Sequence, residues 1–115
     1  MIAVRMAVLA GILCEQMVAG EGNVDIAAVS GDFSVPVSAW YLKQMGFPVG
    51  NIICCCNENS SIWELFHHGE FRTGTIAIKT ELPAADVAVP VSLERLIHGC
   101  GGYAESCKYV DVLRK

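Results

Sequence analysis

The stretch that decides the fold is residues 30–59, which read SGDFSVPVSAWYLKQMGFPVGNIICCCNEN. It opens with a short Gly/Ser loop over residues 30–34 and continues as an apolar helical pattern to Met45. Pro36 suits the first turn of this helix, where no backbone N–H is needed. Residues 51–56 then form an apolar run, as in a parallel strand that is covered on both faces. Loop, helix and strand in this order predict an α/β fold.

The chain on either side continues the alternation of helices and strands. Apolar residues at helical spacing predict helices, short apolar runs predict strands, and glycines mark the expected helix ends. The expected elements are helix 2–19, strand 25–29, the helix to Met45 ended by Gly46, strand 51–56, helix 62–68 ended by Gly69, a short strand or extended loop over 75–79, and helix 93–98, capped by Ser92 and broken by Gly99, Gly101 and Gly102. This order predicts a small parallel sheet flanked by helices, with right-handed crossovers.

The size and composition of the chain point to a single domain with buried interfaces. Its 115 residues suffice for one partial α/β domain with a modest core, over residues 1–115, and we assign no element to the tail, residues 103–115. Hydrophobic residues make up 53% and charged ones 17%, which is apolar for a small free-standing domain. We therefore expect surfaces buried against the remainder of a larger protein or in an oligomer. The net charge of −4 argues against nucleic-acid binding.

The six cysteines do not form the pattern of a disulfide framework. Three of them are consecutive at residues 54–56 in an apolar run, where pairing would strain the disulfide geometry. Reduced thiols indicate a cytoplasmic protein. Buried cysteine behaves as a small hydrophobe, so we expect no metal centre there. His67 and His68 with Glu64 have ligand spacing on a helix but lack a second pair, which favours a solvated helix end.

An apolar run near the N-terminus imitates a secretory signal peptide. It covers residues 6–14 after Arg5, and residues 18–20 resemble a cleavage site. The run is too short to span a bilayer, and the residues before Cys14 lack the small side chain of a lipoprotein signal. Apolar side chains recur at helical spacing throughout the segment, at Ile2, Met6, Leu9, Leu13 and Met17. We therefore expect a packed helix and no membrane segment.

The candidate binding site is the loop formed by Ser30, Gly31, Asp32, Phe33 and Ser34. It follows the expected strand at its carboxyl end, where ligands of α/β sheets lie. Backbone N–H groups at a helix start point at an anion, and the helix dipole favours it. The loop can therefore cradle a phosphate, with the two serine hydroxyls as further donors. The alternative is an ordinary strand-to-helix connection that binds nothing.

Five motifs in a common order resemble the threonine synthases, which are pyridoxal-phosphate enzymes of fold type II. The motifs are Gly31-Asp32-Phe33-Ser34, Lys43-Gln44-Met45-Gly46-Phe47-Pro48, Asn57-Glu58-Asn59, Thr80-Glu81-Leu82-Pro83-Ala84-Ala85-Asp86-Val87 and Glu94-Arg95-Leu96. Each motif is weak alone, so their joint order and spacing carry the resemblance, which runs from about Arg5 to about Gly102.

The resemblance implies an internal fragment of the large domain of such an enzyme, with pyridoxal phosphate held by the loop. The full-length family converts O-phosphohomoserine and water to threonine and phosphate. Two departures from the family's Gly-Asn-Phe-Gly loop bear on binding. Asp32 replaces the asparagine and places a carboxylate beside a dianionic phosphate. Ser34 replaces the second glycine and restricts the backbone where close approach is needed.

The lysine that forms the Schiff base in pyridoxal-phosphate catalysis lies, in the family, upstream of the phosphate loop. None of Lys43, Lys79, Lys108 and Lys115 occupies that position. We therefore assign no catalytic residue and expect the chain alone to be inactive.

Three roles remain open on the sequence. The first is an inactive threonine synthase-like fragment, and the second is a non-catalytic module that binds a small phosphorylated molecule or self-associates. The third is one part of a split enzyme that a complementing polypeptide completes. Residues 57–59 follow the second strand at the same edge of the sheet, where they either orient a substrate or form a turn with an Asx cap.

Overall fold

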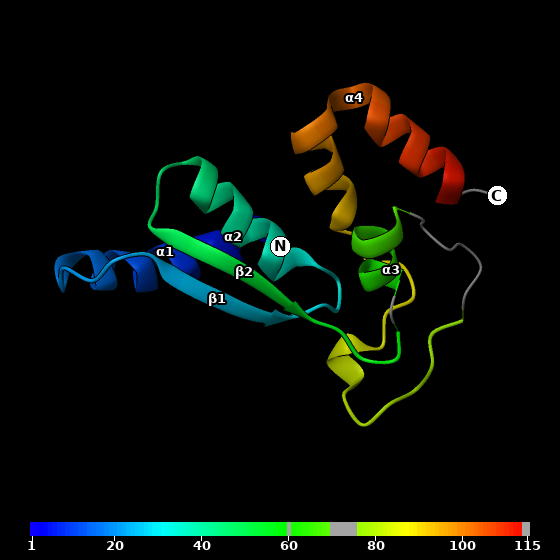
Figure 1. The fold of residues 1–115 in the computed structure, drawn as a ribbon, viewed down its shortest axis with the longest axis horizontal. Coiled ribbons are helices and arrows are strands. Elements are labelled where there is room, and N and C mark those ends of the chain that lie inside the picture. The colour runs from blue at the N-terminus through cyan, green and yellow to red at the C-terminus, as the bar shows by residue number, and fades with distance from the viewer. Residues whose placement is uncertain (60, 70–75, 114–115) are drawn as a thin grey trace. The chain divides into compact units, whose positions relative to one another are not determined.

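The structure is a computed structural model that describes residues 1–59, 61–69 and 76–113. Its elements are α1 (Ile2–Val18), β1 (Val24–Val29), α2 (Ser34–Gln44), β2 (Val49–Cys55), α3 (Ser61–His68), the 3₁₀ turn η1 (Pro83–Ala85) and α4 (Leu93–Leu113) (Figure 1). The predicted α/β class with a small parallel sheet is confirmed. The chain divides into two compact units, one of residues 1–29 and 34–55 and one of residues 30–33 and 56–115.

The first unit is a two-stranded parallel sheet with helices stacked behind it. β1 pairs with β2 from Val24 opposite Val49 to Val29 opposite Cys55. α2 contacts both strands, and α1 packs on α2 (Figure 1). The two predicted strands and the two predicted helices are therefore confirmed, with ends that differ by one or two residues.

The core of the first unit lies between α1, α2 and the sheet. Leu13, Leu42 and Val49 are buried at its centre. Partly buried apolar residues pack around them, namely Met6, Leu9, Ala10, Val24, Ile26, Phe47 and Ile52. Burying apolar side chains contributes about 25 cal/mol for each Å² removed from water, so this layer is what holds the helices on the sheet.

The expectation that the second strand is covered on both faces is wrong. Side chains in both strands alternate between more and less buried positions. Val29 is 39% exposed and Ile53 is 49% exposed. Since successive side chains of a strand point to opposite faces, one face of the sheet lies against α2 and the other is open in the described part of the chain. The apolar run at residues 51–56 therefore does not mean that both faces of the strand are buried.

The second unit contains α3, η1 and α4. Gly69 ends α3 with a positive φ of 71°, as predicted. Residues 76–79 form neither helix nor strand. Of the two predicted alternatives, the extended loop is therefore confirmed and the short strand is not. Thr75 lies outside the described residues.

The expectation that the last helix ends at His98 is wrong. α4 continues through Gly99 and Gly101 and bends at Gly102, whose φ of 76° and ψ of −168° are not helical. A glycine inside a helix costs only about 1 kcal/mol relative to alanine, so neighbouring packing can carry the helix across it. Ser106 and Tyr109 are buried on the arm of α4 after Gly102, in the tail for which the sequence predicts no element.

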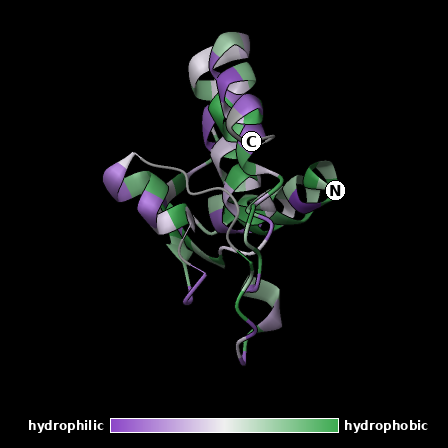
Figure 2. Cartoon of the chain, turned by 90° about the vertical axis from the view of Figure 1, so that its right-hand side faces the viewer, coloured by the Kyte–Doolittle hydropathy of each residue, from purple (hydrophilic) through white to green (hydrophobic). Residues whose placement is uncertain are grey.

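α1 is apolar around most of its circumference, as the mostly green and white ribbon next to the N label shows (Figure 2). Among the described residues, no helix combines the length and the apolar character that crossing a bilayer requires.

Candidate functional site

The predicted binding loop lies where the sequence placed it, between the carboxyl end of β1 and the start of α2. Ser30, Gly31, Phe33 and Ser34 are buried, and Asp32 is half-buried. The location of the loop is therefore confirmed, whereas cofactor binding by these five residues stays a prediction.

The loop is a tight turn closed by its own backbone. The N–H of Phe33 donates to the carbonyl oxygen of Ser30 at 2.7 Å. Phe33 has a φ of 63°, a left-handed conformation that is rare for a bulky residue. Its ring packs 6.1 Å from the ring of Phe66, which helps to hold this backbone. The N–H of Phe33 thus points into the turn.

A later segment of the chain covers the loop. A Cβ atom added at Gly31 would lie 2.5 Å from the carbonyl oxygen of Ala84, so only glycine fits there. The φ of 38° at Gly31 also favours glycine. Next to it, the carbonyl oxygen of Asp32 accepts a hydrogen bond from the N–H of Ser92 at 3.1 Å. The segment from Ala84 to Ser92 therefore closes over residues 30–33.

Residues 57–59 form a turn, and the Asx-cap interpretation is confirmed. The side-chain oxygen of Asn57 accepts a hydrogen bond from the N–H of Asn59 at 2.9 Å. The side-chain amide of Asn59 then pairs with the backbone of Ile78, donating to its carbonyl at 2.9 Å and accepting from its N–H at 2.8 Å. Both amides are thereby engaged within the chain, which speaks against a substrate-orienting role.

The two asparagines meet Thr80 and Asp86 in one polar cluster. We call Asn57, Asn59, Thr80 and Asp86 the Asp86 network. Asp86 Oδ1 accepts hydrogen bonds from the Thr80 hydroxyl at 2.7 Å and from Asn57 Nδ2 at 2.9 Å. It also accepts one from Asn59 Nδ2 at 3.2 Å. Asp86 Oδ2 accepts the backbone N–H of Thr80 at 2.8 Å. Within the second unit, the network ties the turn at residues 57–59 to the segment that covers the loop.

These hydrogen bonds set the charge state of Asp86. The backbone N–H of Thr80 lowers the pKa of Asp86 most, followed by the Thr80 hydroxyl; burial opposes them, and the Asn57 amide and the charge of Lys79 lower the pKa by smaller amounts. The carboxylate is thus held ionised by donors that stabilise the charged form.

Both motifs of the network, residues 57–59 and residues 80–87, are recognisable in the sequence, but the contact between them is not. Thr80 and Asp86 flank Pro83, and the turn η1 begins at that proline. A Thr and an Asp on either side of a proline turn are the signal that points to a side-chain bridge here.

The remaining candidates of the sequence lie apart from the loop. The His67 ring stacks on Trp63 at 4.3 Å, and its Nδ1 lies 3.0 Å from the Trp63 carbonyl oxygen. All six cysteines are free thiols. In residues 1–59, 61–69 and 76–113, no three His, Cys, Asp or Glu side chains are grouped so that they could hold a metal ion.

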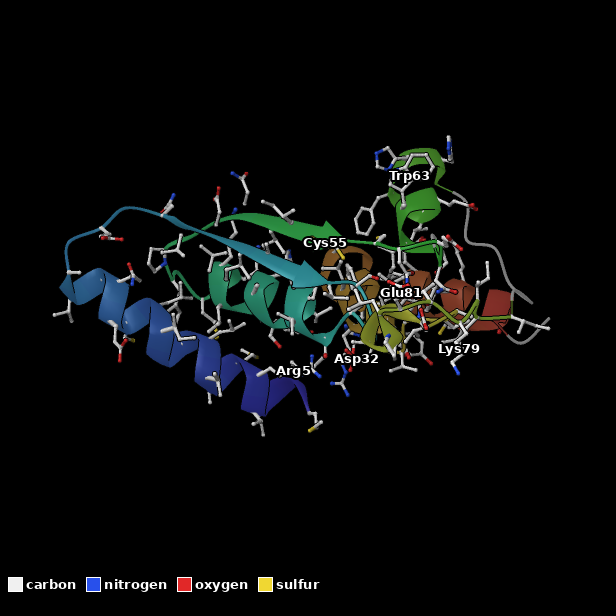
Figure 3. The ribbon with its side chains drawn as sticks, turned by 90° about the horizontal axis from the view of Figure 1, so that it is seen from below. Arg5, Asp32, Cys55, Trp63, Lys79 and Glu81 are labelled. Carbon is white, nitrogen blue, oxygen red and sulfur yellow. The ribbon has the colours of Figure 1, made fainter. Side chains whose placement is uncertain are left out.

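The described lysines are placed as surface groups. Lys43 Nζ donates to the Gly50 carbonyl at 2.5 Å, and Lys108 pairs with Glu105 at 2.6 Å. The side chain of Lys79 is directed away from Asp32 (Figure 3). Lys115 lies outside the described residues.

Comparisons with known proteins support the resemblance of the motifs at a coarse level. No model of a protein family matches the chain. The chain is 30% identical over 76 residues to the threonine synthase of Eremothecium gossypii, which covers 66% of this chain and 15% of that protein. It is 31% identical over 77 residues to threonine synthase-like 1 of Homo sapiens, covering 65% of this chain and 10% of that protein.

A third relative is the threonine synthase of Corynebacterium glutamicum, with 29% identity over 77 residues, 65% of this chain and 16% of that protein. The aligned stretch thus spans only 10% to 16% of the length of these relatives. Over about two thirds of its length, this chain is therefore distantly similar in sequence to threonine synthases and threonine synthase-like proteins.

Proposed function

We propose that this chain is a non-catalytic threonine synthase-like module, in which the former phosphate loop serves as a structural turn. The observation that carries the proposal is the contact between Gly31 and the carbonyl oxygen of Ala84. A carbonyl oxygen carries partial negative charge, so it repels a phosphate at the backbone where a cradle would need open N–H groups.

The loop does not fit the phosphate of pyridoxal phosphate, the cofactor that the resemblance implies. The N–H of Phe33 is donated to Ser30 within the turn. The half-buried Asp32 adds a carboxylate where the ligand would bring a dianion, and like charges at close range repel. The charge of Asp32, the internal hydrogen bond of Phe33 and the closure of the loop by Ala84 thus all support the proposal that the loop does not bind a phosphate.

Among the described lysines we also find no candidate for the Schiff base that catalysis by this chain alone would need. A Schiff base on pyridoxal phosphate needs a lysine amine next to the cofactor. Lys43 and Lys108 are engaged with Gly50 and Glu105, and Lys79 points away from the loop (Figure 3). The conversion of O-phosphohomoserine to threonine is therefore proposed only for longer relatives of this chain.

A second candidate function is one part of a split enzyme, and the open face of the sheet favours it. Parallel sheets are normally covered on both faces, yet Val29 and Ile53 are exposed here. A complementing polypeptide that carries the lysine would cover this face. Mixing the chain with such a polypeptide and measuring threonine formation distinguishes this candidate from the first.

Titration of pyridoxal phosphate into the purified chain tests the proposal. Cofactor absorbance and thermal stability are recorded for the native chain, for Asp32→Asn and for Glu58→Gln, which removes an equal charge outside the loop. We expect no binding by any of the three, and no threonine or phosphate from O-phosphohomoserine. Binding by the native chain overturns the proposal. Binding by Asp32→Asn alone shows that the charge, rather than closure by Ala84, excludes the phosphate.

A further inference from the structure

The kink at Gly102 divides α4 into two arms, which we call the first arm, before Gly102, and the second arm, after it (Figure 1). The φ of 76° and ψ of −168° at Gly102 lie in a region that is essentially restricted to glycine. A Cβ added at Gly101 would lie 2.7 Å from Cγ of Glu105, so glycine also suits that position. The Ser106 hydroxyl donates to the Gly102 carbonyl oxygen at 3.2 Å. The bend is therefore specified by the residues at and around it.

The two arms border a pocket of about 500 Å³ within the second unit. Glu94 and His98 line it from the first arm, and Tyr103, Ser106 and Asp111 are among the residues that line it from the second. Pockets that hold small molecules typically measure about 300–1,000 Å³, so the size of this one suits a small organic ligand. None of its lining residues belongs to the binding loop or to the Asp86 network.

The pocket carries one carboxylate on each arm. Glu94 lies eight residues before Gly102 and Asp111 nine residues after it, so each lies about 12–14 Å along its own arm from the kink. Burial raises the pKa of Tyr109, on the second arm, to about 12, and the charge of Glu94 adds to this rise, so Glu94 acts on the opposite arm. The described residues that line the pocket include no Lys or Arg. Two negative charges thus face the space between the arms.

The second arm also supplies an apolar wall. Tyr103, Cys107 and Val110 all line the pocket from this arm. A hydrogen bond with Cys107, one turn further along, raises the pKa of Tyr103 and orients its side chain along the arm. A phenol ring attracts a cation placed over its face, and methylene groups pack favourably against valine. The pocket therefore combines two negative charges with a surface for a hydrocarbon chain.

We propose that this pocket binds a small aliphatic diamine, with Glu94 and Asp111 as the counter-ions of its two ammonium groups. A phosphate or another anion is repelled by the two carboxylates, and no basic residue among the described lining residues offsets them. A metal ion is disfavoured, because within the described residues no three His, Cys, Asp or Glu side chains are grouped to hold one. A lysine side chain of another protein brings a single charge and leaves one of the two carboxylates unmatched.

Calorimetric titration of the purified chain with putrescine, a four-carbon diamine, tests the proposal. The titration is made at about pH 8, where free imidazole is uncharged, and at about 0.15 M salt, where long-range attraction is screened. We expect Glu94→Gln and Asp111→Asn each to weaken binding about threefold, and the double variant about tenfold. Glu105→Gln is the matched control, because Glu105 lies on the second arm but pairs with Lys108 outside the pocket lining, and it should leave the affinity unchanged. Circular dichroism checks that all variants are folded.

Three further probes separate a diamine site from general attraction of cations. Butylamine has the same chain with one ammonium group, as in a lysine side chain, and should bind about threefold more weakly. Succinate has the same length with two negative charges and should not bind. Magnesium chloride at an equal concentration should not displace putrescine. The proposal is overturned if putrescine does not bind, if butylamine binds equally well, if succinate binds or magnesium displaces putrescine, or if Glu105→Gln has the effect of Asp111→Asn.

Gly102→Ala tests whether the site depends on the kink. Alanine disfavours the backbone conformation of residue 102 and favours a continuous helix. We expect the helical circular dichroism signal to be kept and putrescine binding to be lost. Gly11→Ala, in α1 where an added Cβ meets nothing within 4 Å, is the control and should leave binding intact. Unchanged binding by Gly102→Ala contradicts the proposal. Because the pocket shares no residue with the binding loop, this result is independent of pyridoxal-phosphate binding.

Discussion

Asp86 binds Thr80 through both carboxylate oxygens, accepting the Thr80 hydroxyl at 2.7 Å and the Thr80 backbone N–H at 2.8 Å. This pair closes the turn η1, and the side-chain amides of Asn57 and Asn59 donate to the same carboxylate. The closed segment includes Ala84, whose carbonyl oxygen contacts Gly31. Within the second unit, the network therefore positions residues 57–59, the turn η1 and the cover of the loop together.

Asp86→Asn should destabilise the second unit. An amide keeps one acceptor oxygen, so it cannot accept all four donors of the network, and polar groups that lose a partner lower stability. We expect a lower thermal midpoint and faster proteolysis between residues 76 and 86. Glu81→Gln, at an exposed residue of the same segment, is the control and should leave both unchanged. Equal effects of the two variants would show that charge alone matters.

Stability should fall in acid because two aspartates have lowered pKa values. The pKa of Asp86 is lowered mainly by Thr80, and that of Asp25 is lowered by the backbone N–H and side-chain amide of Asn51. A carboxylate with a lowered folded pKa contributes stability above the ordinary value of 3.8, and this contribution is lost as the pH falls through the folded pKa. Urea unfolding from about pH 6 to about pH 2 measures it.

The double variant Asp25→Asn with Asp86→Asn should flatten this acid dependence. If the urea midpoint of the native chain stays constant when the pH is lowered beneath about 4, these two aspartates are not the cause of acid destabilisation.

Gly31→Ala should destabilise the closed loop. The added Cβ would lie 2.5 Å from the Ala84 carbonyl oxygen, and the φ of 38° is unfavourable for alanine. We expect a loss of about 1–3 kcal/mol in the free energy of unfolding, measured by urea titration. Gly22→Ala is the matched control, because its Cβ meets nothing within 4 Å. If the two variants are equally stable, Ala84 does not close the loop.

Leu13→Ala should unfold the first unit more readily than any surface change. Leu13 is 1% exposed and packs with Leu42 and Val49. Removing a buried leucine side chain leaves a cavity and costs about 2–5 kcal/mol. Leu82→Ala, at a residue that is 48% exposed, should cost far less. Chemical denaturation compares the two, and similar losses would place Leu13 outside the core.

The secondary structure was largely predictable because its signals are local. Pro36 in the first turn of α2 and the positive-φ glycines Gly46 and Gly69 after α2 and α3 act within a few residues of themselves. The exception is α4, where three glycines predicted an end at His98 and only Gly102 left the helix. Its continuation depends on burial of Ser106 and Tyr109, which no local signal reports.

What the sequence determined by itself was the order of elements, the place of the loop and the similarity to threonine synthases, because each depends on neighbouring residues or on motif order. Only the tertiary structure decided that Ala84 covers Gly31, that Asp86 gathers Thr80 and two asparagines, and that one sheet face is open. The physical reason is that these outcomes depend on contacts between segments far apart in the chain, whose chemistry is visible in the sequence while their distance is not.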